Sequence, residues 1–237
     1  MVTTTSGASY GPVVAPDSIA SAWGTNLATA TTPATGFPLP SNLGNTQITI
    51  TDSTGAKLPA LLYLVSPGQI NFLVPANTAL GRATLVVTSG GNTVAQGALL
   101  VSNVAPAIFS ADATGKGVPA AQVLRVTPSG VASVESPFRP GATAGTFVST
   151  PINVSTADRV YLILYGTGIR RHSLNPVKAT IGGISVPVLY AGAQSQYPGL
   201  DQVNLGPLPQ TLAGKGEVDL ILTVDGVPAN VGRVAFQ

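Results

Sequence analysis

The feature that most constrains the fold of this chain is a sequence that occurs twice. QINFLVPANTALG fills residues 69–81, and QVNLGPLPQTLAG fills residues 202–214. Two flanking pairs also match: WGTNL at 23–27 with YGTGI at 165–169, and residues 83–101 with residues 218–236. The segments keep their order, while the offset falls from 142 residues at Trp23 and Tyr165 to 133 at Gln69 and Gln202. Insertions and deletions in loops produce such drift, and a period of this length is too long for a solenoid. We therefore predict a duplicated domain.

Each copy has the pattern of β-strands. Apolar residues at 218, 220, 222 and 224 alternate with polar residues at 217, 219 and 223, which is the period of a strand with one wet face. Asp225-Gly226 then marks a hairpin turn. VYLILYG at 160–166 is a continuous apolar run and predicts a strand buried on both faces. Short strands separated by turn signals are typical of sandwiches. The expected fold is all-β, with two tandem immunoglobulin-like β-sandwich domains related by internal duplication.

The expected organisation is an N-terminal arm at 1–13, a first sandwich at 14–104 and a second sandwich at 105–237. Residues 120–159 have no counterpart in the first copy, so we expect them to add an extra β-hairpin layer to the second sandwich, with a turn at Thr127–Gly130. The arm carries no charge and is rich in Thr, Ser and Gly. It is expected to be either a floppy terminus or a strand that pairs along an edge of its own chain or of a neighbour.

Composition excludes several classes of protein. Only 8% of the residues are charged and the formal net charge is +2, so no footprint for nucleic acid is visible. The chain has no Cys, which excludes disulfides and thiolate metal sites. No apolar run reaches the length of a membrane span, and the first residues lack the basic start and apolar core of a signal peptide.

Groups able to carry catalysis are few. His172 is the sole histidine and is expected to be a solvated loop residue. Gly7-Ala-Ser9-Tyr-Gly11 matches a nucleophile elbow by letters, but no strand precedes it and no helix follows. Glu217 and Asp219 share one strand face and are expected to be a solvated edge rather than a glycosidase pair. We therefore expect no enzyme, no catalytic residues and no cofactor.

No metal site is expected either, because a single histidine cannot build one of two or more His. Calcium binding stays open, since Asp112, Asp201 or Asp225 could contribute ligands although no EF-hand spacing supports them.

The repeated motif itself is expected to be structural. Gln69 and Asn71 follow Pro67-Gly68, as Gln202 and Asn204 follow Pro198-Gly199, and Gly24 and Gly166 are the matching glycines of the two GT turns. We interpret the amides as partners of loop backbone that the turns leave unpaired. The alternative is a pair of amides that contacts a ligand, as in sugar recognition.

Six segments occur in a recognisable order: VAPDSIASAWGTNLA (14–28), VSPGQINFLVP (65–75), APAIFSADATGKGVPAAQ (105–122), VYLILYGTGIR (160–170), ATIGGISVPVLYAG (179–192) and GLDQVNLGPLPQTLAGKGEVDLILTVDG (199–226). Together they resemble the Solibacter-type C-terminal domain, a family of uncharacterised domains at the ends of large secreted proteins of Acidobacteria and relatives. The resemblance implies an extracellular setting and IPT/TIG-like sandwiches, and it implies no activity. Such domains usually follow a longer N-terminal portion, so the chain is expected to be an excised piece or a very short member.

These observations lead to three hypotheses about function. The first is a non-catalytic extracellular or cell-surface module for adhesion, attachment or assembly, with itself, another surface protein or a glycan as partner. So few charges leave sheet edges weakly protected against strand pairing, which favours association through edge strands or the arm. The second is a carbohydrate-binding module, for which exposed Tyr and Trp would be platforms, although Trp23 is expected in the core. A hydrolase is the remote third.

Overall fold

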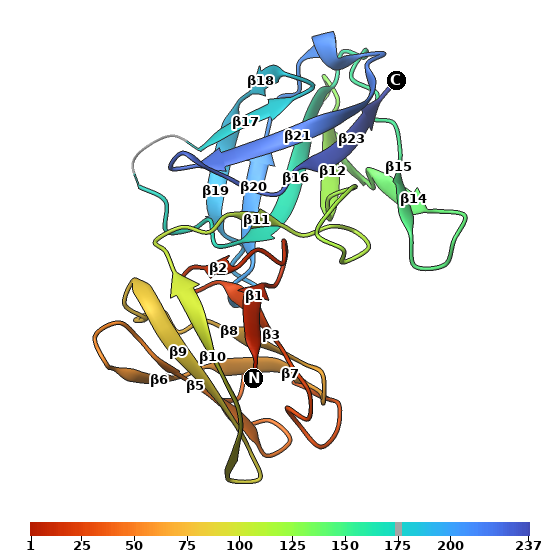
Figure 1. The fold of residues 1–237 in the computed structure, drawn as a ribbon. Coiled ribbons are helices and arrows are strands. Elements are labelled where there is room, and N and C mark those ends of the chain that lie inside the picture. The colour runs from red at the N-terminus through yellow and green to blue at the C-terminus, as the bar shows by residue number, and fades with distance from the viewer. Residues whose placement is uncertain (174–176) are drawn as a thin grey trace. The chain divides into compact units, whose positions relative to one another are not determined.

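The computed structural model of the protein describes residues 1–173 and 177–237. These residues form strands and turns, which confirms the all-β fold class. The chain divides into two compact units: unit 1 comprises Met1–Ala105 with Gln196–Gly199, and unit 2 comprises Pro106–Ser195 with Leu200–Gln237 (Figure 1). In the described part of the chain the only helical element is η1 (Gln210–Leu212), and no helix there is long enough to cross a membrane.

Unit 1 is a sandwich of two five-stranded sheets. Sheet 1a has the order β1 (Thr3–Ser6), β3 (Ile19–Trp23), β8 (Gln69–Leu73), β7 (Leu61–Val65) and β4 (Thr32–Pro33). Sheet 1b has the order β2 (Val13–Val14), β10 (Asn92–Val101), β9 (Gly81–Ser89), β5 (Thr46–Thr51) and β6 (Lys57–Pro59). Alternate side chains of both sheets meet in one core, where Phe72 of sheet 1a and Ile50 of sheet 1b are fully buried.

Unit 2 also has two main sheets. Sheet 2a has the order β13 (Ala132–Glu135), β12 (Ala121–Val126), β16 (Arg159–Thr167), β20 (Asp201–Leu205) and β19 (Val188–Ala193), and β11 (Ala107–Ile108) also pairs with β16. Sheet 2b has the order β18 (Ile184–Val186), β17 (Lys178–Ile181), β21 (Gly216–Val224) and β22 (Val227–Pro228), and β23 (Gly232–Phe236) also pairs with β21. Strands β14 (Phe138–Pro140) and β15 (Phe147–Ser149) form a separate hairpin.

The two units have the same strand order. In sheet 1a, β1-β3-β8-β7 corresponds to β12-β16-β20-β19 of sheet 2a, and β6-β5-β9-β10 of sheet 1b corresponds to β18-β17-β21-β23 of sheet 2b. This is the order of an immunoglobulin-like sandwich. Registers agree as well, since Trp23 lies opposite Gln69 and Tyr165 opposite Gln202. Internal duplication is our interpretation of this agreement.

Two finer details recur in both units. The strand that precedes the repeated Pro-Gly pair carries a β-bulge at the same place, between Leu62 and Leu64 in β7 and between Val188 and Tyr190 in β19. In each unit a short segment that precedes the strand of the GT motif also pairs in parallel with the last strand: Val13–Val14 pairs with β10, and Ile152 pairs with β23. By register, Leu64 therefore corresponds to Tyr190.

Residues 1–13 do not form a floppy terminus, so that alternative for the N-terminal arm is wrong. β1 pairs with β3 over four residues, and Val13 starts β2 on the edge of β10. Val2 is buried and its N–H donates to the Gln96 carbonyl, 3.2 Å away. The segment pairs along edges of its own chain because those strands offer unpaired backbone groups that the uncharged residues can satisfy.

The expectation that all of residues 120–159 form an extra layer is also wrong. β12 lies beside β16 in the place that β1 takes beside β3, and Ile152 takes the place of β2. Within residues 120–159, only the hairpin β14–β15, strand β13 and their loops lack a counterpart in unit 1. The predicted turn at Thr127–Gly130 is confirmed, since it joins β12 to β13 with Gly130 at φ +85°.

Candidate binding faces

The repeated Gln and Asn residues lie on the outer faces of two sheets, where each is half-buried. Gln69 and Asn71 alternate with buried residues along β8, and Gln202 and Asn204 do so along β20. Their side chains are therefore on the outer faces of sheets 1a and 2a, away from each core. The same hydrogen bond recurs in both units: the glutamine Nε2 donates to the asparagine Oδ1, at 2.7 Å in unit 1 and 2.8 Å in unit 2.

The expectation that these amides bond loop backbone is wrong. Besides Gln69, the partner of Asn71 is the hydroxyl of Ser21, which donates to Asn71 Oδ1 at 2.9 Å. The turn before Gln69 is closed by Ser66, whose hydroxyl donates to the Gln69 carbonyl and accepts from the Gln69 N–H. A local serine thus satisfies the turn, and the amides remain on the sheet surface.

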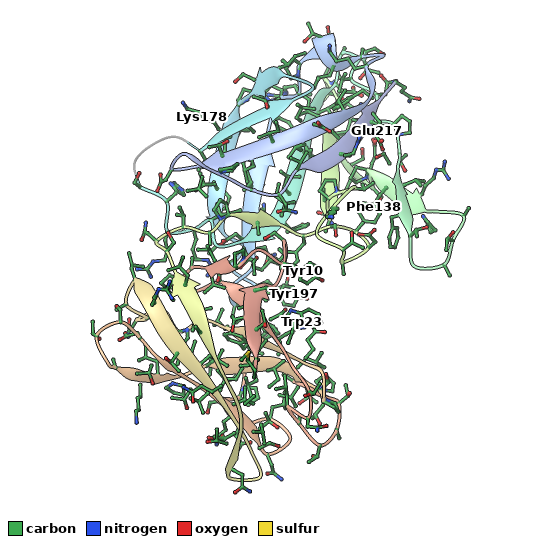
Figure 2. All side chains as sticks on the ribbon, viewed as in Figure 1. Tyr10, Trp23, Phe138, Lys178, Tyr197 and Glu217 are labelled. Carbon is green, nitrogen blue, oxygen red and sulfur yellow. The ribbon has the colours of Figure 1, made fainter. Side chains whose placement is uncertain are left out.

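Trp23 is not in the core either. Its side chain is 37% exposed, its Nε1–H donates to Thr5 Oγ1 at 3.1 Å, and its ring meets Tyr10 edge-on at 5.9 Å (Figure 2). The small residues Ala20 and Ala22 point inward instead and are fully buried. Because the two alanines of β3 face the core, the alternation of the strand places the Trp23 side chain on the outer face.

Tyr165 occupies the same position in unit 2. Its hydroxyl donates to Gln122 Oε1 at 3.0 Å. Gln122 lies opposite Ile163, as Thr5 lies opposite Ser21, so the ring bonds the equivalent residue of the neighbouring strand in both units. We define the aromatic–amide cluster as Trp23, Thr5, Gln69 and Asn71 in unit 1 and as Tyr165, Gln122, Gln202 and Asn204 in unit 2.

The repeated glycines follow the aromatic residues for a steric reason. A Cβ on Gly166 would lie 2.4 Å from the Ala107 carbonyl oxygen and 3.0 Å from Ile169 Cδ1. A Cβ on Gly24 would lie 3.2 Å from the Met1 carbonyl oxygen and 2.9 Å from Leu27 Cδ2. In both units the backbone of an early segment passes over the glycine, so no larger residue fits there without movement.

The outer face of sheet 2a continues the cluster in three rows. The first row holds Tyr165, Gln202 and Gly192, and the second holds Gln122, Ile163, Asn204 and Tyr190. The third holds Val134, Leu124 and Tyr161. None of these ten residues is charged. The expectation that 160–166 is buried on both faces is wrong, because Tyr161, Ile163 and Tyr165 are half-buried on this face.

A hollow of about 420 Å³ borders the first two rows at β12. Gln122 and Tyr165 line it from the sheet, and Val134, Glu135 and Phe138 line it from the chain that follows. Phe138 is fixed by an edge-on contact with Phe147 across the hairpin, with ring centroids 5.4 Å apart. The hollow lies within the size range of small-ligand sites, about 300–1,000 Å³.

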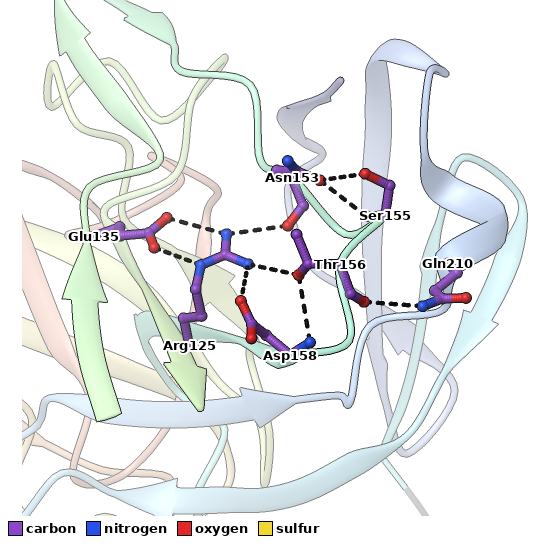
Figure 3. A network of polar contacts seen from close by, with 7 residues as sticks. All are labelled: Arg125, Glu135, Asn153, Ser155, Thr156, Asp158 and Gln210. Atoms are coloured by element: carbon purple, nitrogen blue, oxygen red, sulfur yellow. Dashed lines mark hydrogen bonds and ion pairs between the residues drawn. The ribbon is translucent and has the colours of Figure 1, made fainter. Parts of the chain in front are cut away.

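Arg125 anchors the strands beside this hollow (Figure 3). Its guanidinium donates to both oxygens of Glu135, at 2.6 and 3.3 Å, to Asp158 at 3.4 Å and to the Asn153 carbonyl at 3.0 Å. Thr156 Oγ1 lies 3.5 Å from Nη1. These contacts engage the N–H groups of the planar guanidinium. Arg125 therefore holds the hairpin β12–β13 against residues 153–158, and its charge neutralises Glu135 at the hollow.

The histidine and serine candidates serve local structure. His172 is half-buried, with Nδ1 2.8 Å from the Ser173 carbonyl and Nε2 3.1 Å from the Ala191 carbonyl, so it links its turn to β19 instead of standing in solvent. Ser9 lies in the turn after β1, where its hydroxyl accepts from the Gly11 N–H at 3.2 Å. No strand-to-helix elbow is formed at this serine.

The acidic candidates are also engaged. Arg233 lies opposite Asp219 and contacts it at 3.9 Å and Glu217 at 3.3 Å, which makes a surface ion pair. Asp112 caps the Thr114 N–H, and Asp225 accepts from the Ser173 N–H and hydroxyl. The hydrogen bonds from Ser173 lower the pKa of Asp225. Among the residues the structure describes, no group of three His, Cys, Asp or Glu side chains could hold a metal ion.

Asp201 is the one fully buried carboxylate. Its Oδ2 accepts from the Ile169 N–H at 2.7 Å, and its Oδ1 lies 2.6 Å from Arg170 Nε. Burial raises the pKa of Asp201, while the Ile169 N–H and the Arg170 charge oppose that rise. The carboxylate thus fixes the turn after β16, next to Gly166 of the repeated motif.

Comparison with known proteins adds no further constraint. No protein-family model matches the chain, and no curated protein is significantly similar to it in sequence. The aromatic–amide clusters and the hollow beside one of them are therefore the features on which a functional proposal must rest.

Proposed function

We propose that the chain is a non-catalytic extracellular attachment module that holds its target on the outer faces of sheets 1a and 2a. The observation that carries the proposal is the aromatic–amide cluster, which both units repeat on a face that contributes nothing to either core. A ring with a polar edge beside an amide pair offers an apolar surface together with hydrogen-bond donors and acceptors.

Two further observations support this proposal. The resemblance of the chain to the Solibacter-type C-terminal domains favours an extracellular setting. The side chains that could have served catalysis are occupied elsewhere, since Glu217 and Asp219 pair with Arg233, and His172 contacts two carbonyl oxygens. Neither set converges on the hollow of sheet 2a.

Self-association is a second candidate function, which the edges of sheet 2a favour. All four residues of β13 are exposed, and the flanking Val131 is 63% exposed. At the other edge, β19 carries no charged residue. Because β19 has no charged residue, whereas β13 has Glu135 at its end, β19 is the edge whose backbone groups a second copy can pair with.

The proposal is tested by adsorption of the full chain to insoluble extracellular materials: cellulose, chitin, collagen and bacterial envelopes. We expect retention on at least one of them, no released product in the supernatant, and loss of retention in a Tyr165→Ala/Gln202→Ala variant. Release of product, or a folded chain that none of the materials retains, would contradict the proposal. Light scattering over a concentration series tests the second candidate, with Val134→Lys expected to abolish any larger species.

A further inference from the structure

We infer that the outer face of sheet 2a binds an uncharged polysaccharide chain, which rests on the proposed attachment function and names its ligand. The face combines a flat exposed ring, a row of amides and a hollow, and the ten residues of its three rows are uncharged. These features come from strands β12, β16, β20 and β19, so the whole sheet contributes to the site.

Tyr190 provides the flat ring. A Cβ on Gly192 would lie 2.8 Å from the Tyr190 hydroxyl oxygen and 3.1 Å from its Cζ, so the ring lies along the sheet over this glycine. The hydroxyl donates to the Ala193 carbonyl at 2.6 Å, which holds the ring in place. The side chain is nevertheless 43% exposed. A ring with one face on backbone and the other in water suits the apolar C–H face of a pyranose.

The amides beside this ring have hydrogen-bonding capacity to spare. Asn204 lies opposite Tyr190 and uses its Oδ1 to accept from Gln202. In the described part of the chain, this leaves the Asn204 Nδ2 donors and Gln202 Oε1 without partners. Gln122 accepts from Tyr165 and keeps its own Nε2 donors. Such mixed donors and acceptors match sugar hydroxyl groups, which both donate and accept.

The dimensions favour a chain rather than a single sugar. From Tyr190 on β19 to Gln122 on β12 the second row crosses three inter-strand gaps, a span of about 14 Å. The hollow beside Gln122 and Tyr165 lies at the end of this row, where Phe138 offers a second ring. One sugar unit would occupy the hollow while others lie along the amides towards Tyr190.

The charge of the face selects against ionic ligands. The nearest carboxylate, Glu135 in the hollow, has both oxygens bonded to Arg125. Within the three rows no cation is available to pair with a uronate or sulfate group, since all ten residues are neutral, and the exposed Arg159 lies one row beyond Tyr161 at the start of β16. Burying an unpaired charge on the ligand against such a surface would cost free energy.

The test measures binding of the full chain to soluble mixed-linkage β-glucan and to galactomannan by isothermal titration calorimetry, with polygalacturonate as the anionic comparison. We expect binding to at least one neutral polymer and none to polygalacturonate. Tyr190→Ala should weaken the binding about tenfold or more, as loss of a stacking ring does. Tyr190→Phe should bind within about twofold of the unmodified chain because the platform remains.

Two isosteric or exposure-matched variants complete the design. Asn204→Asp keeps the shape but places a charge on the face, so it should also weaken binding about tenfold. Ile221→Ala removes a side chain that is 41% exposed on sheet 2b and should bind normally. Normal binding by both Tyr190→Ala and Asn204→Asp, or preference for polygalacturonate, would overturn the inference. Retention on collagen alone would overturn it too, while leaving the proposed attachment function intact.

Discussion

Gly24 and Gly166 recur in the two units because a backbone carbonyl lies close to the Cβ position of each. We expect Gly166→Ala to destabilise the protein by about 1–3 kcal/mol, because the new methyl group meets a backbone carbonyl that moves only with its strand. Gly24→Ala should cost less, since its closest neighbour is the flexible end of Leu27. Chemical denaturation measures both. Gly36→Ala is the control, because no atom beyond its two chain neighbours lies within 4 Å of its Cβ position and the expected change is within about 0.5 kcal/mol.

Asp52 gives the protein a defined response to acid. Its carboxylate accepts from the Thr54 hydroxyl at 2.7 Å, the Thr54 N–H and the Ala79 N–H at 2.9 Å, and the Ala56 N–H at 3.1 Å. These bonds, the Thr54 hydroxyl foremost, lower the pKa of Asp52 to about 2. The unfolded pKa is near 4, so the ionised form stabilises the fold above about pH 4. This stabilisation is lost as the pH falls from about 4 to about 2.

Thermal melts across this pH range test the role of Asp52. Asp52→Asn should flatten the fall in melting temperature, because the variant has no carboxylate to protonate. Thr54→Val, which removes the largest contribution to the lowered pKa, should act in the same direction with smaller effect. An unchanged acid response in Asp52→Asn would show that other groups control it.

At the scale of elements, alternation and turn residues predicted most strands, and the exceptions have physical reasons. The period of β21 and the turn after β12 follow from local sequence. The place of β12 beside β16 does not, because TTTS of β1 and AQVLRV of β12 share only their backbone pairing. The sequence of such an edge strand does not indicate which distant strand it pairs with.

The repeat singles out four residues of the proposed site, for which the sequence predicts a structural role, and it does not predict where they lie. The doublet singled out Gln69, Asn71, Gln202 and Asn204, yet their outward direction depends on which neighbours face the core. Trp23 was misplaced for the same reason, since hydrophobicity alone favours tryptophan over alanine for the interior. The sequence does contain an indication of the correct direction. Trp23 lies two residues after the polar Ser21, so both side chains point to the same face of the strand, which is the outer one.

The N-terminal strands offer a prediction at this scale. Deleting residues 1–13 removes β1 from β3, Val13 from β10 and Val2 from the core. We expect a loss of at least about 2 kcal/mol, the contribution of one buried valine, with further loss from the bare edges. Light scattering should then show larger species, since β3 and β10 would be open to other chains.

The same deletion distinguishes pairing within a chain from pairing between chains. If the full chain forms a larger species that the deletion abolishes, the segment acts on a neighbour instead. Thr3→Ala is the control, because this exposed outer side chain should change stability by no more than about 0.5 kcal/mol.

At the scale of the whole molecule, the scarcity of charge predicts how binding responds to salt. With a net charge of +2 and only 8% charged residues, attraction to the ligand must come from ring contacts and neutral hydrogen bonds. The dissociation constant for a neutral polysaccharide should therefore change by less than about twofold between low and high salt, where charged contacts would be screened. A polyanion bound through Lys and Arg would instead show a steep dependence.

Both sites can be followed separately in the intact chain. Trp23 is the only tryptophan, so its fluorescence reports on the cluster of unit 1. A change in emission that survives Tyr190→Ala would mean that unit 1 binds independently of the face of sheet 2a. No change at any ligand concentration would restrict binding to unit 2.

The parallel pairing of β2 with β10 has a mechanical consequence. When a tethered module is pulled by its ends, tension that has reached β2 draws it one way while β10 is drawn the other. Parallel neighbours loaded like this slide along each other, so the bonds at Leu100–Val13 and Val101–Val14 stretch together. In antiparallel neighbours the same tension would load and break the hydrogen bonds one after another. Unit 1 is thus expected to withstand stretching force, and an optical-trap experiment on the full chain would measure the rupture force.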